Sequence, residues 1–279
     1  MSGKITLVAT PIGNLADMSK RAIDTIAEAD LVAAEDTRHS GSLLHHFGIK
    51  RPMVSYYKHN EKAQEEHLLQ ALREGKNIAL ISDAGTPGVS DPGSAILQSA
   101  VAAGFEVDAV PGPCAAVQAL VLSGLPTEKF VFEGFLPRGS KLTPYLQSLK
   151  NEPRTMIIYE APHRIKETLA AAAEVFGGER KAALCRELTK KFQEVNRGTL
   201  AEICGLWQNR EVMGEFVLVV AGAEPAAAEL DMAAVAEHLK RLLAGGMKHK
   251  AAAKEVASVY GLPAGEVYAL GLKLKEELK

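Results

Sequence analysis

A loop at residues 82–93 carries the residues best suited to holding a small ligand. It follows an apolar run, residues 78–82, and its sequence, SDAGTPGVSDPG, combines glycines, prolines and the carboxylate of Asp83. Glycine lets the backbone approach a ligand or adopt positive φ, and proline stiffens the chain beside it. Ligands of open α/β sheets bind outside the carboxyl ends of the strands. The loop therefore predicts a ligand site, although a tight turn in which Asp83 caps its own backbone is an equal alternative for this loop alone.

The end of the same loop predicts the start of a helix. Asp91 has the short polar side chain of a typical N-cap residue, and Pro92 suits the first helical position. Gly104 suits the position just after a helix. We therefore expect a helix over residues 92–103.

Two further loops next to apolar runs have the same character. Residues 9–14 (ATPIGN) follow the apolar run 5–9, and residues 110–116 (VPGPCAA) lead into a helix of small side chains. Small side chains let a flat ligand lie against the backbone, and close helix packing is their alternative use. Cys114 is either a nucleophile or, since no base is evident beside it, a packed thiol. The first loop lacks a GxGxxG fingerprint and the chain has no GxxxxGK[ST] motif, which argues against dinucleotide and P-loop sites.

Charged residues follow other apolar runs. Glu35, Asp36 and Arg38 form a dense cluster after residues 31–34. An acid at this place suits a ribose, but an internally paired helix start is the favoured alternative. The cluster alone therefore does not establish a ligand site.

The second half of the chain has similar charged segments. Glu133 lies in FEGFLPR and Glu160 in YEAPHR, both after predicted strands. Charges at the end of a buried strand need partners or a ligand, so Glu160 and Arg164 form either an ion pair or part of a site. Arg186 and Glu187 begin a net basic cluster, and a glycine before the last apolar run is able to admit a ligand.

The scaffold for these residues follows from the alternation of strand-like and helix-like segments, which predicts an α/β fold with a parallel, doubly wound sheet. The first unit has predicted strands 5–9, 31–34, 53–56, 78–82 and 107–110, and helices 19–28, 61–73, 92–103 and 114–122. The second unit repeats this style with strands 130–133, 156–160, 182–186 and 216–221, a helix over 164–175, and a helix opened by the capping box of Thr199 and Glu202.

Changes in composition divide the chain into three predicted domains. Two α/β domains span residues 1–116 and 117–224, and residues 223–229 resemble a linker. A small helical domain, 230–279, has predicted helices 232–243, 250–260 and 264–277 with short turns, as in a helix-turn-helix bundle.

Composition limits the classes of protein and site. The chain has 279 residues, of which 47% are hydrophobic and 24% charged, so it has ample material for folded domains. A net charge of −2 confines any nucleic-acid site to part of the surface. The three cysteines and eight histidines have no metal-ligand spacing, so we expect no metal site. Without a signal-like or membrane-length segment, we expect a cytoplasmic protein that does not enter membranes.

The motif set as a whole resembles a known family. VATPIGNL, AAEDTR, SDAGTPGVSDPG, VPGPCA, FEGFLPR, YEAPHR, CRELTK, RGTL and GEFV occur in this order. This ordered set of motifs resembles that of the bacterial 16S rRNA cytidine 2′-O-methyltransferases of the tetrapyrrole-methylase superfamily, and the resemblance covers nearly all of residues 4–222. The resemblance implies two α/β domains with S-adenosylmethionine in the cleft between them, a homodimer, and methylation of the ribose of a decoding-centre cytidine in 16S rRNA within the 30S subunit.

The resemblance also implies which residues line the cofactor site. Cys114 departs from the serine or threonine common at its position, so a hydroxyl contact is not expected there. The matching positions are Pro11, Asp83, Thr86, Cys114, Ala115, Glu160, Leu188 and Gly214.

The implied reaction needs alignment of the hydroxyl with the methyl group, and a base or cation that favours the alkoxide. We expect the base among Glu133, Glu160 and Glu187, with none singled out. We expect phosphate contacts from Arg38, Arg164 and Arg186.

A basic stripe in the helical tail adds to the RNA hypothesis. Residues 239–254 contain five lysines and arginines, among them Lys248 and Lys250, and no acid. Such a stripe supplies salt-dependent phosphate affinity, although a solvated helix face is the alternative. Two other functions are considered for the whole chain: methylation of a corrin or porphyrin precursor, and a non-catalytic RNA-binding assembly factor.

Overall fold

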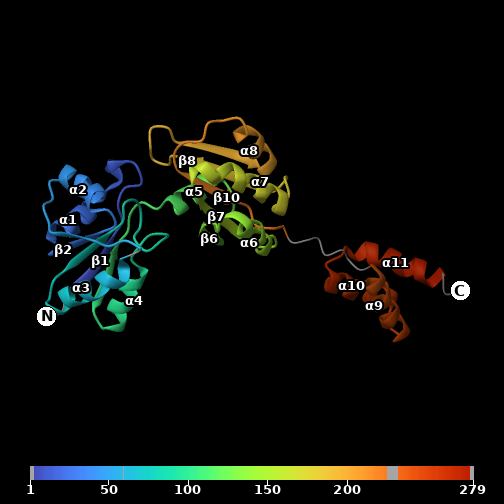
Figure 1. The fold of residues 1–279 in the computed structure, drawn as a ribbon. Helices are drawn as coiled ribbons and strands as arrows, with labels where there is room; N and C mark the ends of the chain where they lie inside the picture. The colour runs from blue at the N-terminus through green and yellow to red at the C-terminus, as the bar shows by residue number, and fades with distance from the viewer. Residues whose placement is uncertain (1–2, 59, 225–231, 277–279) are drawn as a thin grey trace. The chain divides into compact units, whose positions relative to one another are not determined.

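The computed structural model describes residues 3–58, 60–224 and 232–276 of the chain. These residues divide into two compact units, one on each side of residue 223. The predicted linker, 223–229, lies outside the described residues except for its first two. The predicted α/β fold with a helical C-terminal part is confirmed (Figure 1). None of the helices in the described part of the chain combines the length and hydropathy that a membrane crossing requires.

The first sheet is parallel and doubly wound, as predicted. Its five strands are β1 (Lys4–Val8), β2 (Leu31–Ala34), β3 (Met53–Ser55), β4 (Ile78–Ile81) and β5 (Glu106–Val110), in the order β3-β2-β4-β1-β5. The helices between them are α1 (Lys20–Glu28), α2 (Thr37–His46), α3 (Glu61–Arg73) and α4 (Ser94–Ala102), and a short 3-10 helix, η1 (Leu15–Asp17), follows β1.

Helices cover both faces of this sheet because successive strand residues point to opposite sides. Leu80 packs with α3 and α4 on one face, and its neighbour Ile81 packs with α1 and α2 on the other. All carboxyl ends of the parallel strands therefore meet at one edge, where the predicted loops emerge.

The second sheet differs from the prediction, because most of it is antiparallel. Its strands are β6 (Phe130–Phe135), β7 (Thr155–Glu160), β8 (Lys181–Arg186), β9 (Glu194–Thr199) and β10 (Phe216–Val220), in the order β6-β7-β10-β8-β9. Only the β6–β7 pair is parallel among these described strands. The seven residues 187–193 are too few for a crossover to a parallel strand, so β8 and β9 form a hairpin.

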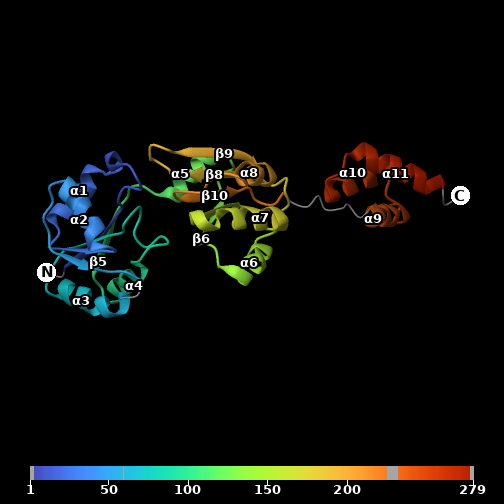
Figure 2. The same ribbon diagram turned by 45° about the horizontal axis from the view of Figure 1, so that its top comes forward.

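Helices also cover both faces of the second sheet (Figure 2). On one face lie α6 (Leu142–Ser148), α7 (Ile165–Phe176) and α8 (Leu200–Trp207), and on the other lies α5 (Ala115–Ser123). Two 3-10 helices, η2 (Gly139–Lys141) and η3 (Pro162–Arg164), precede α6 and α7. The predicted domain boundary after residue 116 falls inside α5, which packs on this second sheet, and the three domain limits stay a prediction.

Two predicted helix starts had different outcomes. The capping box of Thr199 and Glu202 opens α8 as predicted. The predicted cap by Asp91 is wrong, since α4 begins at Ser94 after Gly93, which has a φ of 135° and no capping side chain. The Gly88 N–H donates to the Pro92 carbonyl instead, at 3.1 Å, which keeps this segment in the loop. Asp91 therefore does not cap α4.

The unit after residue 223 contains three packed helices, as predicted. They are α9 (Met232–Ala244), α10 (His249–Tyr260) and α11 (Ala264–Glu276). Val235, Leu239, Val256 and Val267 are buried in their shared core. This unit therefore has its own hydrophobic core.

Candidate active site

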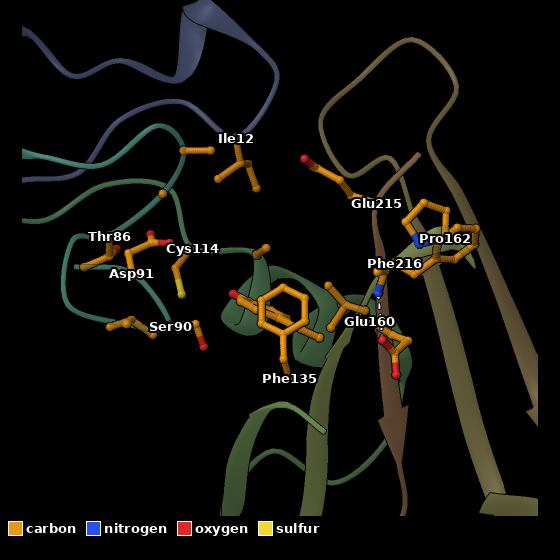
Figure 3. Close-up of a pocket in the computed structure, with 17 residues that line it drawn as sticks. Ile12, Thr86, Ser90, Asp91, Cys114, Phe135, Glu160, Pro162, Glu215 and Phe216 are labelled. Atoms are coloured by element: carbon orange, nitrogen blue, oxygen red, sulfur yellow. Dashed lines mark hydrogen bonds between the residues drawn. The ribbon is translucent and has the colours of Figure 1, made fainter. Parts of the chain in front are cut away.

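A cavity of about 340 Å³ lies between the loops of the first sheet and the strand ends of the second (Figure 3). The first sheet contributes the loops after β1, β4 and β5, and the second contributes the ends of β6 and β7 and the start of β10. Because β10 runs antiparallel to β7, with Phe216 opposite Glu160, the start of one strand meets the end of the other. Three loops and three strand ends thus meet at one place.

The loop after β4 is held by hydrogen bonds to its neighbours. The backbones of Thr10 and Gly85 exchange two hydrogen bonds, at 2.8 and 3.1 Å. The Thr86 hydroxyl donates to the carbonyl of Pro113 at 3.3 Å. The carboxylate of Asp83 accepts from the Asp36 N–H at 3.1 Å, so it joins two loops instead of capping its own turn. These hydrogen bonds connect the loops that form this wall of the cavity.

Tyr159 joins the second sheet to the same wall. Its hydroxyl accepts a hydrogen bond from the Ala116 N–H at 3.0 Å, near the start of α5. Burial raises the pKa of Tyr159. Its ring contacts Phe132 and Phe135 edge to face, with centroids 4.9 and 5.7 Å apart. The cavity thus has an aromatic side built from β6 and β7.

Glu160 lines the cavity but its carboxylate is fully occupied. The side chain is 0% exposed, and its oxygens accept from the Thr168 hydroxyl at 2.6 Å and from the Ala161 N–H at 2.8 Å, the second of which is dashed in Figure 3. The guanidinium of Arg164 lies 3.4 Å away and also donates to the carbonyls of Leu136 and Pro137. The ion pair considered from the sequence is therefore present, and it leaves the buried Arg164 no free face for a phosphate.

Glu187 holds the loop between β8 and β9. Its carboxylate accepts from the ammonium of Lys190 at 2.9 Å and from the Glu215 N–H at 3.0 Å. Burial favours the protonated form, but these hydrogen bonds and the charges of Lys190 and Arg186 outweigh it and lower the pKa of Glu187. Gly214, with a φ of 93°, passes so close that a Cβ there would lie 2.6 Å from the Glu187 side chain. Both residues therefore shape this loop beside the cavity.

Glu133 lies outside the cavity, at a bulge in β6. The pairing of β6 with β7 skips this residue, between Phe132 and Gly134. Its carboxylate accepts from the Tyr145 hydroxyl at 2.6 Å, which raises the pKa of Tyr145 to about 12. Glu133 therefore has a protein partner within its own sheet.

Asp91 belongs to the predicted ligand loop and lines the cavity, although its side chain was expected to cap a helix. It lies beside Thr86 and Cys114 at the cavity (Figure 3). Burial, together with the nearby carboxylates of Glu35 and Asp83, raises the pKa of Asp91 to about 7, against a hydrogen bond with Ser82. The sequence signal for its place at the cavity was a second carboxylate in the loop that contains Asp83.

The predicted cofactor residues come together around this cavity. Four line it directly, namely Thr86, Cys114, Ala115 and Glu160. Three directly precede lining residues, namely Pro11, Asp83 and Gly214. Leu188 is buried in the core cluster that contains Ile12 and Val217. Their contacts with a cofactor stay predictions.

The predicted RNA contacts lie in different places. Arg38 is 92% exposed and pairs with Asp36 at 3.3 Å, which bears out the internally paired helix start. Arg186 donates to the Met213 carbonyl at 2.7 Å and is half-buried. Lys248 and Lys250 are exposed on the separate helical unit. Within the described residues, no group of three His, Cys, Asp or Glu side chains is placed to hold a metal ion.

Known proteins resemble the chain at two levels. Residues 4–204 match the family model described as Tetrapyrrole (Corrin/Porphyrin) Methylases. Two relatives, from Synechocystis sp. and Pseudomonas aeruginosa, are named ribosomal RNA small subunit methyltransferase I, and each is 44% identical to this chain. The match to the Synechocystis protein covers 99% of both chains, and the match to the Pseudomonas protein covers 98% of both. Among solved structures, diphthine synthase has a TM-score of 0.62 at 16% identity, covering 79% of this chain and 90% of its own. Uroporphyrin-III C-methyltransferase from Thermus thermophilus, complexed with S-adenyl homocysteine, has a TM-score of 0.56 at 16% identity, covering 78% and 97%.

Proposed function

Since the chain belongs to the tetrapyrrole (corrin/porphyrin) methylase family, we propose that it methylates small-subunit ribosomal RNA with S-adenosylmethionine as methyl donor. The finer proposal is transfer to the ribose 2′-hydroxyl of a decoding-centre cytidine in 16S rRNA, within the 30S subunit, by a homodimer. The observation that carries the RNA substrate is the length of the match: relatives named for rRNA align with 98–99% of the chain, helical unit included.

The cavity suits this cofactor in size and lining. Its volume of about 340 Å³ lies within the range of small-molecule sites, about 300–1,000 Å³. Ala84, Ala115 and Ala161 leave room for a flat ring against the backbone, and Thr86 and Asp91 add polar groups. When bound, S-adenosylmethionine supplies a methyl group activated by a positively charged sulfur. We propose that Thr86, Cys114 and Ala115 contact it directly.

The helical unit and α2 supply the substrate side of the proposal. Lys248 and Lys250 are exposed, as are the other basic residues of the stripe, Lys240, Arg241 and Lys254. Contacts from such residues to phosphates give affinity that depends on salt and not on base sequence. We propose these residues, with Arg38, as RNA contacts, and assign Arg164 to the buried ion pair.

The proposal is tested by methyl transfer from labelled cofactor. The full chain is incubated separately with 30S particles, protein-free 16S rRNA and tetrapyrrole precursors, and labelled RNA is digested to nucleosides to locate 2′-O-methylcytidine. We expect label in the 30S sample. Label in the tetrapyrrole sample alone would overturn the RNA substrate, and a wild-type chain that binds no cofactor would support a non-catalytic role.

A matched pair of variants links the activity to the cavity. Ala115→Leu places three extra carbons in the cavity, whereas Ala103→Leu makes the same change at an exposed residue after α4. We expect only Ala115→Leu to lose cofactor binding and transfer. Equal behaviour of the two variants would show that this cavity is not the cofactor site.

A further inference from the structure

Transfer of a methyl group to a hydroxyl releases a proton, and the cavity contains three carboxylates to receive it: Asp91, Glu160 and Glu215. Glu160 is fully buried and its oxygens are occupied by Thr168, Ala161 and Arg164. Glu215 is 74% exposed and its carboxylate pairs with Lys190 at 3.1 Å. Asp91 is the remaining carboxylate of the cavity wall.

Asp91 has surroundings that suit a proton acceptor. Ser82 hydrogen-bonds to it, and the carboxylates of Glu35, after β2, and Asp83, after β4, face it from the same sheet edge. The thiol of Cys114, before α5, lies beside Asp91 in Figure 3, and the hydroxyl of Tyr159, on β7, is near enough for the Asp91 charge to raise its pKa. Among the described residues, no lysine or arginine forms an ion pair with Asp91. Among the described residues, the Asp91 carboxylate can therefore take up a proton without first breaking an ion pair.

We propose that Asp91 is the catalytic residue that accepts the proton of the ribose 2′-hydroxyl, an inference that rests on the proposed function. The O–H bond breaks and its proton passes to the Asp91 carboxylate. The oxygen's electron pair forms the bond to the methyl carbon, and the bond from that carbon to sulfur breaks with its pair remaining on sulfur. This assignment replaces Glu133, Glu160 and Glu187, each of which is held by protein groups.

The acidity of Asp91 agrees with this geometry. Burial and the two neighbouring carboxylates raise the pKa of Asp91 to about 7. A general base works best when its pKa lies near the working pH, because it is then both deprotonated and basic enough. The rate of transfer at saturating substrate is therefore expected to rise with pH up to about 7 and then level.

The test compares Asp91→Asn, which keeps the shape and removes the charge, with Asp108→Asn, at an exposed carboxylate on β5 outside the cavity. We expect Asp91→Asn to lower kcat for 30S methylation by roughly 10²–10⁴-fold, the usual contribution of a general base. We expect it to change cofactor Kd, measured by calorimetry, by less than about tenfold, and to lose the rise of kcat toward pH 7. We expect Asp108→Asn to match wild type in all three measurements.

A measurement without substrate checks the site independently of catalysis. A carboxyl group with a raised folded-state pKa binds more protons when folded, so stability falls as pH rises from the unfolded value near 4 to the folded value near 7. The stability of Asp91→Asn relative to wild type, measured by thermal unfolding, is therefore expected to rise as the pH rises through this window.

The outcomes separate the two proposals. If wild type is active on RNA and Asp91→Asn keeps its kcat and pH profile, the assignment of Asp91 is overturned. It is also overturned if Asp91→Asn weakens cofactor binding with kcat unchanged, which indicates a binding role. If wild type methylates no RNA, the proposed function fails and this inference fails with it.

Discussion

At the scale of single residues, the site combines fixed charges with one carboxylate that is easily protonated. Glu160 and Arg164 form a buried pair, with side chains 0% and 9% exposed, and Thr168 completes the set of partners. Removing two charges from water costs free energy that offsets their attraction, so this pair contributes a fixed geometry and not net stability. It fixes the end of β7 at the cavity, where Tyr159 and Ala161 depend on its position.

Removing one partner of this pair is expected to lower the free energy of unfolding, because the other charge stays buried without its counter-ion. Arg164→Met leaves the Glu160 carboxylate buried without its cation, and loss of one partner of a buried pair costs about 3–5 kcal/mol. We expect this drop in the free energy of unfolding from urea titrations. The double variant Glu160→Gln/Arg164→Met removes the stranded charge and is expected to recover part of the loss. A double variant no more stable than Arg164→Met would contradict this explanation.

At the scale of elements, the loop between β8 and β9 is a constrained connection beside the site. Glu187 and Thr189 adopt positive φ, at 50° and 65°, although neither is glycine. Such conformations persist where surrounding contacts impose them. Here Lys190 bridges Glu187 and Glu215, and its side chain lies against Gly13 of the loop after β1. The loop thus links the two sheets beside the cavity.

Two glycines offer a matched test of this loop. Gly214 and Gly177 both have a φ near 90°, at 93° and 92°, but a Cβ meets Glu187 at Gly214 and open space at Gly177. Substitution by alanine at these positive φ values is expected to cost each variant at least about 1–3 kcal/mol of stability. We expect only Gly214→Ala to displace the loop and weaken cofactor binding, on the order of tenfold, or about 1.4 kcal/mol. Equal cofactor affinities for the two variants, measured by calorimetry, would contradict the role of the loop.

Local sequence signals predicted most of the fold. The apolar strands and the three tail helices occur as predicted, and α3 matches residue for residue. The strand β9 was missed because its sequence, EVNRGT, is largely polar, as an edge strand permits. The reversed direction of β10 was missed because it depends on pairing with β7 and β8, which are distant from it in sequence.

The site was predictable as a set of loops but not in its charge pairing. Glycine and proline identified the loops after β1, β4 and β5, because the backbone conformations of such loops favour these two residue types in the local sequence. Asp91 was assigned to a helix cap because nothing local shows that Gly93 takes that position. Likewise, the partners of Glu133 and Glu187 lie in neighbouring segments whose contacts arise only on folding.

At the scale of the whole molecule, the chain keeps its cavity and its basic stripe in separate compact units. Residues 4–204, matched by the methylase family model, lie entirely in the first unit. The second unit has its own core and exposes the lysines of α10 and the turn before it. This division separates the expected chemistry from the expected attachment to RNA.

The salt dependence of RNA binding tests that division. Removing one lysine–phosphate interaction makes the slope of log K against log salt shallower by roughly 0.7–0.9. Lys248→Gln/Lys250→Gln is therefore expected to give a shallower slope and to weaken binding to 30S particles, while cofactor affinity stays unchanged. Lys62→Gln, at an exposed lysine on α3, serves as the control and should retain the wild-type slope. A double variant with the slope of the control would assign these lysines to a solvated surface.

The central place of β10 sets the order in which the molecule is completed during its own synthesis. The first sheet has all its strands once residue 110 has been made, whereas β7 and β8 keep unpaired edges until β10 arrives between them. Unpaired edges are surfaces through which growing chains associate wrongly. The start of β10 also lines the cavity. Until residue 220 has emerged from the ribosome, the nascent chain therefore has two incomplete halves of the second sheet with unpaired edges, and its ligand site is not complete.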